Sequence, residues 1–520
     1  MAMRKVYTVL ISLVVALGGF LLGFDSAVIS GAVPFIRDYF QLGDMELGWA
    51  VSCLIFGAMA GNSIAGPVSD FLGRKRVLII TAVLFTISAI TSALARDYWF
   101  FIVARILGGI GVGGAILIAP VYIAEIAPPE KRGLLVSFNQ LNIVIGISAA
   151  YWSNYFLLDT GINNWRWMLG VEAVPAILYF SFLFAVPRSP RWLVQNGRDQ
   201  EAISVMEKVG GKDYARKSFE MIKSHLGIVQ EKAKLSALFT RKMSFIMFIA
   251  FAIAFFQQIT GINAILYYAP TIFEKTGGGQ DSAFMQAIVI GLVNFGFTIV
   301  ALWLIDRLGR KPLLLIGTSV MAISLLVNAG AFYSADYQVT EKSLSQLEAE
   351  IPAELLLELR SFQGVVYPTQ LEFSNSLDQK LGTDVHADHK SAILTASFRI
   401  NAILVLFAII GFVAAFAISL GPVMWALLSE IFPNRLRGIA ISAVGLFNSL
   451  VSFTVTLVFP WELSNLGPSG TFLIYGLFSL LAFLFVWRYI PETKGKSLEE
   501  LESILIKTDG DTPESKTAMV

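Results

Sequence analysis

The chain has few charged residues, cysteines and histidines. Asp, Glu, Lys and Arg make up 15% of its 520 residues, against about 25% in a typical soluble domain, and the mean hydropathy is +0.67. Cys53 is the single cysteine, which excludes an intrachain disulfide and indicates no redox role. The histidines lie in predicted loops; His386 and His389 could bind a metal weakly, but a solvated loop face is the favoured interpretation. We therefore expect no metal site and no cofactor.

Long apolar runs occupy most of the chain. Runs of about 20 residues match the thickness of a bilayer, where only closed helices or barrels satisfy their backbone. The first run follows Arg4 and Lys5 as in a signal peptide, but it is too long, contains Asp25 and lacks a convincing cleavage site. The fold class is therefore predicted to be all-α, in a lipid bilayer, with twelve spans. They lie at about 7–33, 47–69, 77–95, 99–124, 134–158, 167–187, 244–274, 283–305, 312–334, 397–430, 436–461 and 469–490.

One short turn occurs twice, each time between two apolar runs. It reads Asp70-Phe-Leu-Gly73-Arg74-Lys75 in the first half and Asp306-Arg-Leu-Gly309-Arg310-Lys311 in the second. Such a duplication predicts two related six-helix bundles, an organisation typical of proteins that move solutes across membranes. The expected units are an N-terminal bundle (1–190), a helical linker (191–243), a C-terminal bundle (244–490) with an insertion at 336–394, and a tail (491–520).

Lys and Arg are unevenly distributed between the loops. The short loops after even-numbered spans hold ten basic residues, and those after odd-numbered spans hold three. The central loop, 188–243, has 12 basic and 6 acidic residues, whereas 336–394 has 4 basic and 10 acidic residues. Because basic loops stay in the cytoplasm, we expect both termini and the central loop to be cytoplasmic and the acidic insertion to lie outside the cell membrane.

A glycine-rich segment gives a formal match to a dinucleotide-binding motif. Gly109-Ile-Gly111-Val-Gly-Gly114 has the Gly-x-Gly-x-x-Gly spacing, but the nucleotide interpretation needs a preceding strand and a following helix N-terminus. Here the glycines lie inside an apolar run, where small residues let helices approach closely. We expect no nucleotide site and no nucleic-acid partner. An enzyme is disfavoured because no nucleophile–base set or metal cluster is visible.

Three ionisable residues lie within predicted spans: Asp25, Arg105 and Glu172. Each costs about 2.5–3.5 kcal/mol at the middle of a membrane, which makes a functional role the default hypothesis. An Asp and an Arg in one bundle can neutralise each other, and separating them in a dry cavity would favour the protonated acid. The residues therefore allow a proton-binding switch. They equally allow a static ion pair that fixes helix packing.

A second set of charges repeats at the ends of the even-numbered spans. Glu125 precedes Arg132 by seven residues, and Glu430 precedes Arg437 by the same spacing. Positive-inside anchoring would explain the arginines but not an acid at a fixed distance from each. We predict interhelix bridges that close the cytoplasmic side. The residues of this predicted gate are Asp70, Arg74, Glu125, Arg132, Asp306, Arg310, Glu430 and Arg437.

Side-chain amides form a third set. Amides in apolar helices need partners, and a polyhydroxylated ligand supplies donors and acceptors together. Helix–helix hydrogen bonding is the alternative, but Gln257, Gln258 and Asn263 are too closely spaced for it to be favoured. Trp425 could place a flat apolar face against sugar C–H groups. The amides are Gln140, Gln257, Gln258, Asn263, Asn294 and Asn448.

These motifs together resemble the sugar porters of the major facilitator superfamily, over nearly the whole chain except 336–394. The motifs are the duplicated Asp-x-x-Gly-Arg-Lys, Gln257-Gln258-Ile-Thr-Gly-Ile-Asn263, Gly421-Pro-Val-Met-Trp425 and Pro491-Glu-Thr-Lys-Gly495. The resemblance implies two six-helix bundles around a central cavity. It implies a sugar site lined by the six amides and Trp425, with Tyr268 nearby.

The resemblance also gives roles to the charges within the spans. Asp25 is similar to the proton-coupling acid of bacterial symporters, Arg105 to its partner and Glu172 to a supporting acid. A proton-coupled importer of a monosaccharide, hexose or pentose, is therefore expected. The alternatives are a passive sugar uniporter and, less favoured, a membrane sugar sensor.

The sequence departs from the family pattern in two places. The usual Pro-Glu-Ser-Pro-Arg reads Pro187-Arg188-Ser189-Pro190-Arg191, so a base replaces an acid where a cytoplasmic bridge is expected. Ser449 stands where several relatives have Trp, which makes one wall of the sugar site less bulky.

The insertion at 336–394 is the third distinctive feature. Its leucines and isoleucine have helical spacing, which predicts a short amphipathic helix. A lid, a partner surface and a tolerated surface excursion all stay open for it. The spaced residues are Leu344, Leu347, Ile351, Leu355, Leu356 and Leu359.

Overall fold

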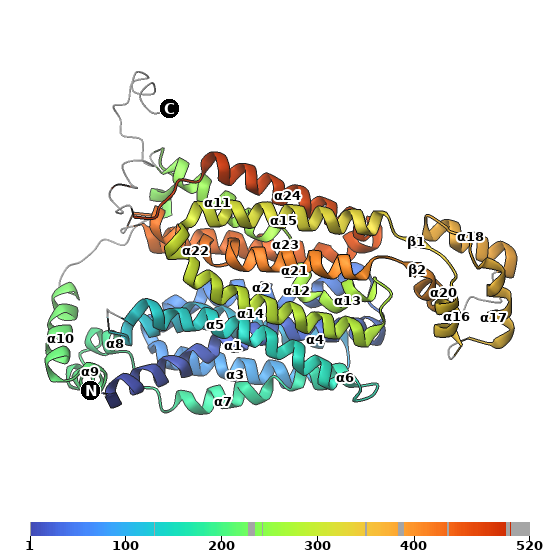
Figure 1. Ribbon diagram of the computed structural model, residues 1–520. Helices are drawn as coiled ribbons and strands as arrows, with labels where there is room; N and C mark the ends of the chain where they lie inside the picture. The colour runs from blue at the N-terminus through green and yellow to red at the C-terminus, as the bar shows by residue number, and fades with distance from the viewer. Residues whose placement is uncertain are drawn as a thin grey trace, which may run out of the picture.

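The structure is a computed structural model that describes residues 2–128, 131–226, 235–241, 243–348, 351–382, 389–433, 436–495 and 500. Within these residues twelve helical segments are long and apolar enough to cross a membrane, and they coincide with the twelve predicted runs. His386 lies outside the described residues. The all-α membrane fold with two six-helix bundles is confirmed, and the bundles lie one above the other in Figure 1.

The N-terminal bundle consists of α1 to α7. Its last span is broken between α6 and α7, so that Glu172 lies in the break. The helices are α1 (Ala2–Tyr39), α2 (Asp44–Leu72), α3 (Arg74–Ala93), α4 (Tyr98–Ile126), α5 (Arg132–Leu157), α6 (Asn164–Gly170) and α7 (Ala173–Leu183). The linker that follows is helical, as predicted, with α8 (Pro190–Gln195), α9 (Asp199–Gly210), α10 (Lys212–Leu226) and the 3₁₀ helix η2 (Leu235–Phe239).

The C-terminal bundle repeats this plan with two more broken helices. Gly261, at a φ of +89°, lies between α11 and α12, and Ser419 lies between α21 and α22. A positive φ suits glycine because it has no Cβ. The helices are α11 (Ser244–Ile259), α12 (Ile262–Tyr267), α13 (Ala269–Glu274), α14 (Gln280–Leu308), α15 (Arg310–Tyr333), α21 (Ala402–Ile418), α22 (Leu420–Ile431), α23 (Arg437–Asn465) and α24 (Gly467–Tyr489).

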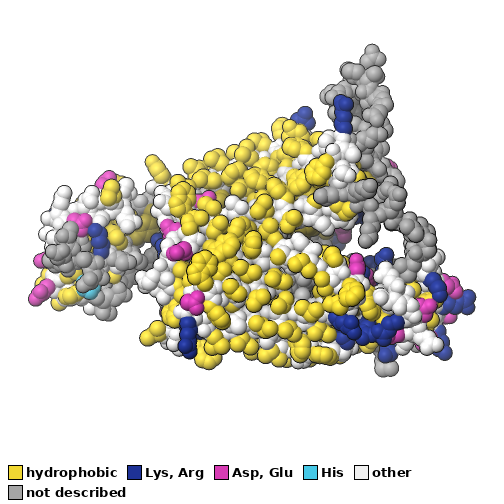
Figure 2. All heavy atoms as spheres, turned by 180° about the vertical axis from the view of Figure 1, so that it is seen from behind, with side chains coloured by type: hydrophobic (Ala, Val, Ile, Leu, Met, Phe, Trp, Pro, Cys, Tyr) yellow, Lys and Arg dark blue, Asp and Glu magenta, His cyan; other side chains and the backbone are white. Residues whose placement is uncertain are grey.

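Apolar side chains cover the middle of the molecule, and charges gather at its two ends (Figure 2). We call the end with α8 to α10 the linker end and the opposite end the insertion end. This separation is expected when lipid surrounds the middle of the protein, because a charge there would lose its hydration.

The glycine-rich segment packs helices together, as predicted. A Cβ on Gly113 of α4 would lie 2.1 Å from the carbonyl oxygen of Ala58 on α2, and one on Gly109 would lie 2.2 Å from that of Leu54. No larger side chain fits between these backbones. The motif therefore serves helix packing.

The two bundles are in tight contact near the insertion end. A Cβ on Gly48, near the start of α2, would lie 1.9 Å from the carbonyl oxygen of Leu457 on α23. On the other side of the interface the Ser148 hydroxyl donates to the carbonyl of Gly291 at 2.9 Å. The Tyr151 hydroxyl donates to the carbonyl of Leu266 at 2.6 Å. These contacts join the halves near the insertion end.

The insertion forms a small helical unit, where the sequence predicted one short helix. We call residues 336–399 the cap. Pro352 starts a second helix instead of continuing the first, because proline fits best at a helix N-terminus. The elements are β1 (Asp336–Tyr337), α16 (Glu341–Leu347), α17 (Ala353–Leu359), the 3₁₀ helix η3 (Arg360–Phe362), α18 (Gln370–Leu381), α20 (Lys390–Ser397) and β2 (Phe398–Arg399).

The cap has its own apolar core and a defined base. Five of the six spaced residues are buried in this core, and Leu356 packs against it. β1 and β2 pair antiparallel, with Asp336 opposite Arg399 and Tyr337 opposite Phe398. The strand pair thus joins the two places where the chain enters and leaves the cap, and the cap lies beyond the ends of α15 and α21 (Figure 1).

Candidate functional site

Asp25 and Arg105 form a buried ion pair inside the N-terminal bundle. α1 and α4 bring the two side chains together, and each is 1% exposed. Arg105 Nη1 donates to Asp25 Oδ1, and Nη2 lies 3.4 Å from the Asp25 backbone oxygen. Asp25 Oδ2 and Arg105 Nε have no partner among the described residues. The carboxylate thus has one neutralising contact and one free oxygen, as a group that exchanges a proton would need.

Glu172 lies near this pair without bonding to it. It directly precedes α7 without a side-chain capping bond, is 3% exposed, and its Oε1 has no hydrogen-bond partner among the described residues. It is close enough to Arg105 and Asp25 to interact with both electrostatically. Two acids and one base therefore share a dry region, and the Asp25–Arg105 contact leaves one acid unpaired.

Four of the predicted amides form one hydrogen-bonded network in the C-terminal bundle. Gln258 Nε2 donates to Asn448 Oδ1 at 3.1 Å, and Asn448 Nδ2 donates to Gln257 Oε1 at 2.8 Å. Asn263 Nδ2 donates to Gln258 Oε1 at 2.9 Å and to the Ser452 hydroxyl at 2.7 Å. The network fixes the orientation of each amide, which would pre-organise a polar surface for a hydroxylated ligand. Sequence reasoning missed Ser452, which lies one helical turn after Asn448.

The other predicted sugar-site residues are not part of this hydrogen-bonded network. Tyr268 is buried, and its hydroxyl donates to the carbonyl of Thr456 at 3.2 Å. Asn294 on α14 is 7% exposed, and Trp425 on α22 is 41% exposed. Gln140 is half-buried on α5 of the opposite bundle. Their roles stay predictions.

Tyr267 is a further residue that sequence reasoning missed. It belongs to α12, directly after the segment that carries Asn263, and it is 9% exposed. Its hydroxyl lies beside Ser26 of α1 and within electrostatic range of Asp25 and Arg105. Tyr267 thus connects the segment with the amides to the helix with the buried acid.

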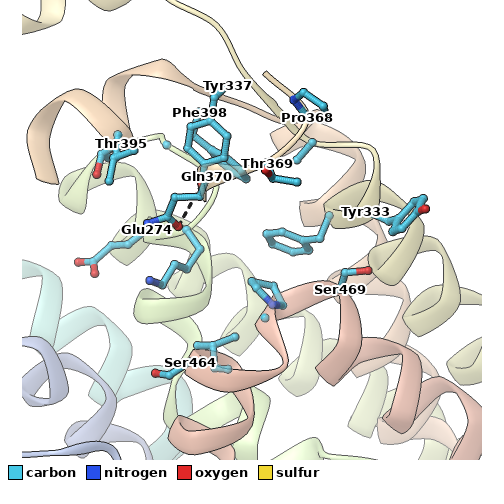
Figure 3. A pocket seen from close by; sticks show the side chains of 18 residues that line it. Glu274, Tyr333, Tyr337, Pro368, Thr369, Gln370, Thr395, Phe398, Ser464 and Ser469 are labelled. Atoms are coloured by element: carbon cyan, nitrogen blue, oxygen red, sulfur yellow. Dashed lines mark hydrogen bonds between the residues drawn. The ribbon is translucent and has the colours of Figure 1, made fainter. Parts of the chain in front are cut away.

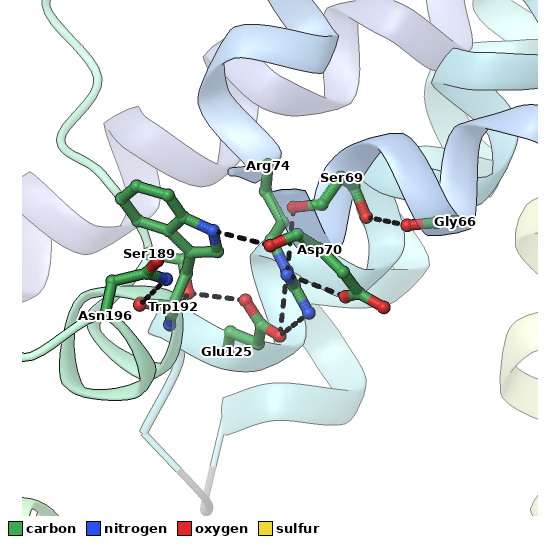
Figure 4. A network of polar contacts seen from close by, with 8 residues as sticks. All are labelled: Gly66, Ser69, Asp70, Arg74, Glu125, Ser189, Trp192 and Asn196. Atoms are coloured by element: carbon green, nitrogen blue, oxygen red, sulfur yellow. Dashed lines mark hydrogen bonds and ion pairs between the residues drawn. The ribbon is translucent and has the colours of Figure 1, made fainter. Parts of the chain in front are cut away.

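The linker end of the N-terminal bundle carries a compact polar corner (Figure 4). Arg74 Nη2 lies 3.1 Å from Glu125 Oε1, and its Nη1 lies 3.1 Å from Asp70 Oδ1. The other Glu125 oxygen accepts from the Ser189 hydroxyl at 2.5 Å. The Trp192 indole N–H donates to the carbonyl of Asp70 at 3.0 Å. The bridge thus ties α2, α3, α4 and the start of the linker together.

The C-terminal bundle carries a matching corner. Arg310 Nη2 lies 2.7 Å from Glu430 Oε1, and its Nη1 lies 3.5 Å from Asp306 Oδ1. The other Glu430 oxygen accepts from the Thr493 hydroxyl at 2.6 Å. Glu492 accepts from the backbone N–H groups of Arg310 and Lys311, both at 3.1 Å. Partial burial would raise the pKa of Glu492, but backbone N–H donors outweigh it and lower that pKa below its usual value.

The two bridges do not use the arginines that lie seven residues after each glutamate. Glu125 binds Arg74 and not Arg132, because α4 ends at Ile126 and the exposed Arg132 begins α5. Glu430 binds Arg310, whereas Arg437 donates to the carbonyl of Phe432. Among the described residues, the ion pairs at the linker end each stay within one half.

Comparison with known proteins agrees with these features. The pattern of the family described as "Sugar (and other) transporter" matches residues 11–347 and 388–505. The chain belongs to this family. It is a sugar porter of the major facilitator superfamily, a family of transporters and not of enzymes.

Several relatives span nearly the whole chain. The arabinose-proton symporter of Bacillus subtilis is 35% identical and the D-xylose-proton symporter of Escherichia coli 34% identical, each over 96% of both chains. A solved structure of the xylose transporter XylE from E. coli in its inward open conformation has a TM-score of 0.75 at 33% identity, over 96% of this chain and all of that one. The family pattern leaves out 348–387, most of the cap.

Proposed function

We propose that this protein imports a monosaccharide together with a proton by alternating access. It does so in a cell membrane, with the linker end facing the cytoplasm. The observation that carries the proposal is the buried Asp25–Arg105 pair. Keeping an ion pair away from water costs free energy, so the presence of the pair inside the bundle favours a functional role. The names of the symporter relatives from B. subtilis and E. coli support the same reading.

The charges give a cycle with a defined role for each residue. A proton that binds Asp25 neutralises it and frees Arg105, which can then turn to Glu172. With Asp25 protonated and sugar bound, closure of the insertion end is favoured. Once the linker end opens, Arg105 returns to Asp25 and the proton leaves. An intact pair together with tight contacts at the insertion end is the arrangement expected after proton release.

The amide network supplies the sugar site. Gln257, Gln258, Asn263 and Asn448 offer both donors and acceptors, which suits a ring of hydroxyl groups. Tyr267 on α12 lies between this network and the Asp25 region. Occupancy of the amides can therefore influence the proton site through one short helix.

The direction of insertion follows from the basic residues. The linker and both duplicated turns lie at one end of the bundles (Figure 1), and the acidic cap lies at the other. From the positive-inside rule we infer that the linker, both termini and the two polar corners face the cytoplasm and that the cap faces the outside of the cell.

The test is sugar uptake by proteoliposomes that carry a pH gradient, with a panel of pentoses, hexoses and inositol. Asp25→Asn should keep sugar binding and sugar exchange but lose uphill accumulation, because an amide cannot take up and release the proton. Asp159→Asn, in an exposed loop after α5, is the matched control and should accumulate sugar normally. Undiminished accumulation by Asp25→Asn would reject the coupling role. Wild-type flux that ignores the pH gradient would mean a passive uniporter.

A further inference from the structure

A large cavity lies between the cap and the insertion end of the C-terminal bundle (Figure 3). Its volume is about 880 Å³, which is near the top of the range of about 300–1,000 Å³ that holds small organic ligands. One wall comes from the cap and includes Tyr337, Gln370 and Phe398. The facing wall comes from the ends of α13, α15 and α23 and includes Glu274 and Ser464. An occupant would therefore touch both units.

The cavity wall on the cap side is held in place by contacts within the cap. Tyr337 and Phe398 pair across the β1–β2 ladder, and their rings lie 5.2 Å apart. The Tyr337 ring also stacks on Phe373 of the cap core at 5.8 Å, and its hydroxyl lies 3.4 Å from Gln370 Oε1. A ligand meets ring faces and an amide that the fold already holds in place, so little ordering is needed on binding.

The chemistry of the lining favours a neutral, hydroxylated ligand. Of the residues that line the cavity, the charged ones are one acid and one base, Glu274 and Lys275. Burial raises the pKa of Glu274 to about 7, so the lining carries at most one positive charge near neutral pH. Side-chain amide and hydroxyl groups come from both walls, at Gln370, Thr369 and Ser464. They stand beside half-buried aromatic rings. Aromatic faces next to hydrogen-bonding groups match the apolar C–H faces and polar edges of a sugar ring.

We propose that this cavity is an outer saccharide-binding site, separate from the central amide network, that takes a neutral sugar of two or three rings. The central network lies deep in the C-terminal bundle on α11, α12 and α23, whereas this cavity lies at the outer ends of the spans, against the cap. Its size exceeds what one sugar ring fills. The proposal rests on the cavity alone and holds whether or not transport is coupled to protons.

The test measures saccharide binding to the full chain in lipid nanodiscs, with maltose, lactose and xylobiose as probes. The background is Gln257→Ala with Asn448→Ala, which disables the central network. In this background at least one disaccharide should still bind. Adding Gln370→Ala or Ser464→Trp, which act from opposite walls, should weaken that binding about tenfold. Gln363→Ala, on an exposed part of the cap away from the cavity, is the matched control and should bind as the background does.

Two outcomes would overturn the proposal. The first is that no disaccharide binds in the background variant. The second is binding that neither cavity substitution weakens, which would place the sugar elsewhere. Monosaccharide uptake by Gln370→Ala and Ser464→Trp in the otherwise unchanged chain verifies that the variants are folded. Failure of proton coupling would appear only in the uptake assay, so the two hypotheses fail separately.

Discussion

The two polar corners at the linker end have the same arrangement of bonds but differ in one residue. In each, an arginine that follows a glycine of positive φ binds a glutamate on the fourth or tenth span. In each, a hydroxyl after a Pro-x pair binds the other oxygen of that glutamate: Ser189 in one half and Thr493 in the other. The residue between proline and hydroxyl is Arg188 in the N-terminal half and Glu492 in the C-terminal half.

This single difference changes how the helix that begins at each duplicated turn is capped, α3 in the N-terminal half and α15 in the C-terminal half. Glu492 accepts from the first N–H groups of α15, which otherwise have no partner in the helix. Arg188 has no acceptor to offer and instead lies 3.8 Å from Glu201 of α9. The Trp192 ring fills the space at Gly73, where a Cβ would lie 3.1 Å from it. The acid at this position therefore caps a helix, and the Arg–Glu bridge forms without it.

The largest expected effect comes from removing the bridging acid. Glu125→Gln leaves the buried Arg74 with only the exposed Asp70 as a counter-charge, and the Arg74–Glu125 pair is 9% and 8% exposed. Loss of one partner of such a pair costs about 3 kcal/mol. Glu430→Gln should cost clearly less, because that pair is 14% and 24% exposed and water screens it. Thermal unfolding midpoints of the purified protein measure both.

Glu220→Gln serves as the control for this comparison. Glu220 lies on α10, and its pair with Arg216 is 68% and 83% exposed, so its loss should leave the midpoint unchanged. Equal losses for Glu125→Gln and Glu430→Gln would show that burial does not set the strength of the bridges.

The spans and the buried ion pair could be predicted from the sequence, whereas most bridge partners could not. Apolar length gave all twelve spans, and two charges in separate spans were enough to pair Asp25 with Arg105, since neither tolerates lipid alone. The bridge partners were harder. Glu125 has Arg132 seven residues away but binds Arg74, a contact that depends on how helices distant in the sequence meet. Ser452 gave no signal, because one hydroxyl in a helix is common. Thr493 lies in the Pro491-Glu-Thr-Lys-Gly495 motif, but the motif did not indicate that Thr493 contacts Glu430.

The cap shows the opposite situation. The spacing of its leucines predicted an amphipathic helix. Periodicity, however, indicates only which face of a helix is apolar and not what covers that face. The pairing of Tyr337 with Phe398 joins residues 61 positions apart in a ladder of two residues. Such a short strand pair has no sequence pattern of its own, and the cavity beneath it follows from that pairing.

The second prediction concerns Glu492, which accepts hydrogen bonds from the N-terminus of α15 in the C-terminal corner. Glu492→Gln should cost about 1 kcal/mol, since an amide oxygen still accepts but carries no charge at the helix N-terminus. The pKa of Glu492 is lowered on folding from its usual 4.5. Its stabilisation is therefore complete above about pH 4.5 and is lost as the pH falls through the lower folded value.

The measurement is the unfolding midpoint of wild type and variant from pH 7 to pH 3.5. The difference should stay constant down to about pH 5 and shrink below it. A difference that grows as the pH falls would contradict the capping role. Glu220→Gln, at an exposed site in the middle of α10, serves no helix terminus and should show no difference.

The smallest expected effect comes from converting one corner toward the other. Arg188→Glu places an acceptor where Glu492 stands in the C-terminal half, and α3 has no side-chain cap at Gly73. A gain of about 0.5–1 kcal/mol is expected from capping and from the helix dipole. Loss of the exposed Arg188–Glu201 contact offsets little of it. Arg188→Gln separates the two causes, because it removes the positive charge without adding an anionic cap. If both variants stabilise equally, removal of the base accounts for the gain. If neither does, Trp192 already covers the end of α3, and the two corners have reached the same stability by different means.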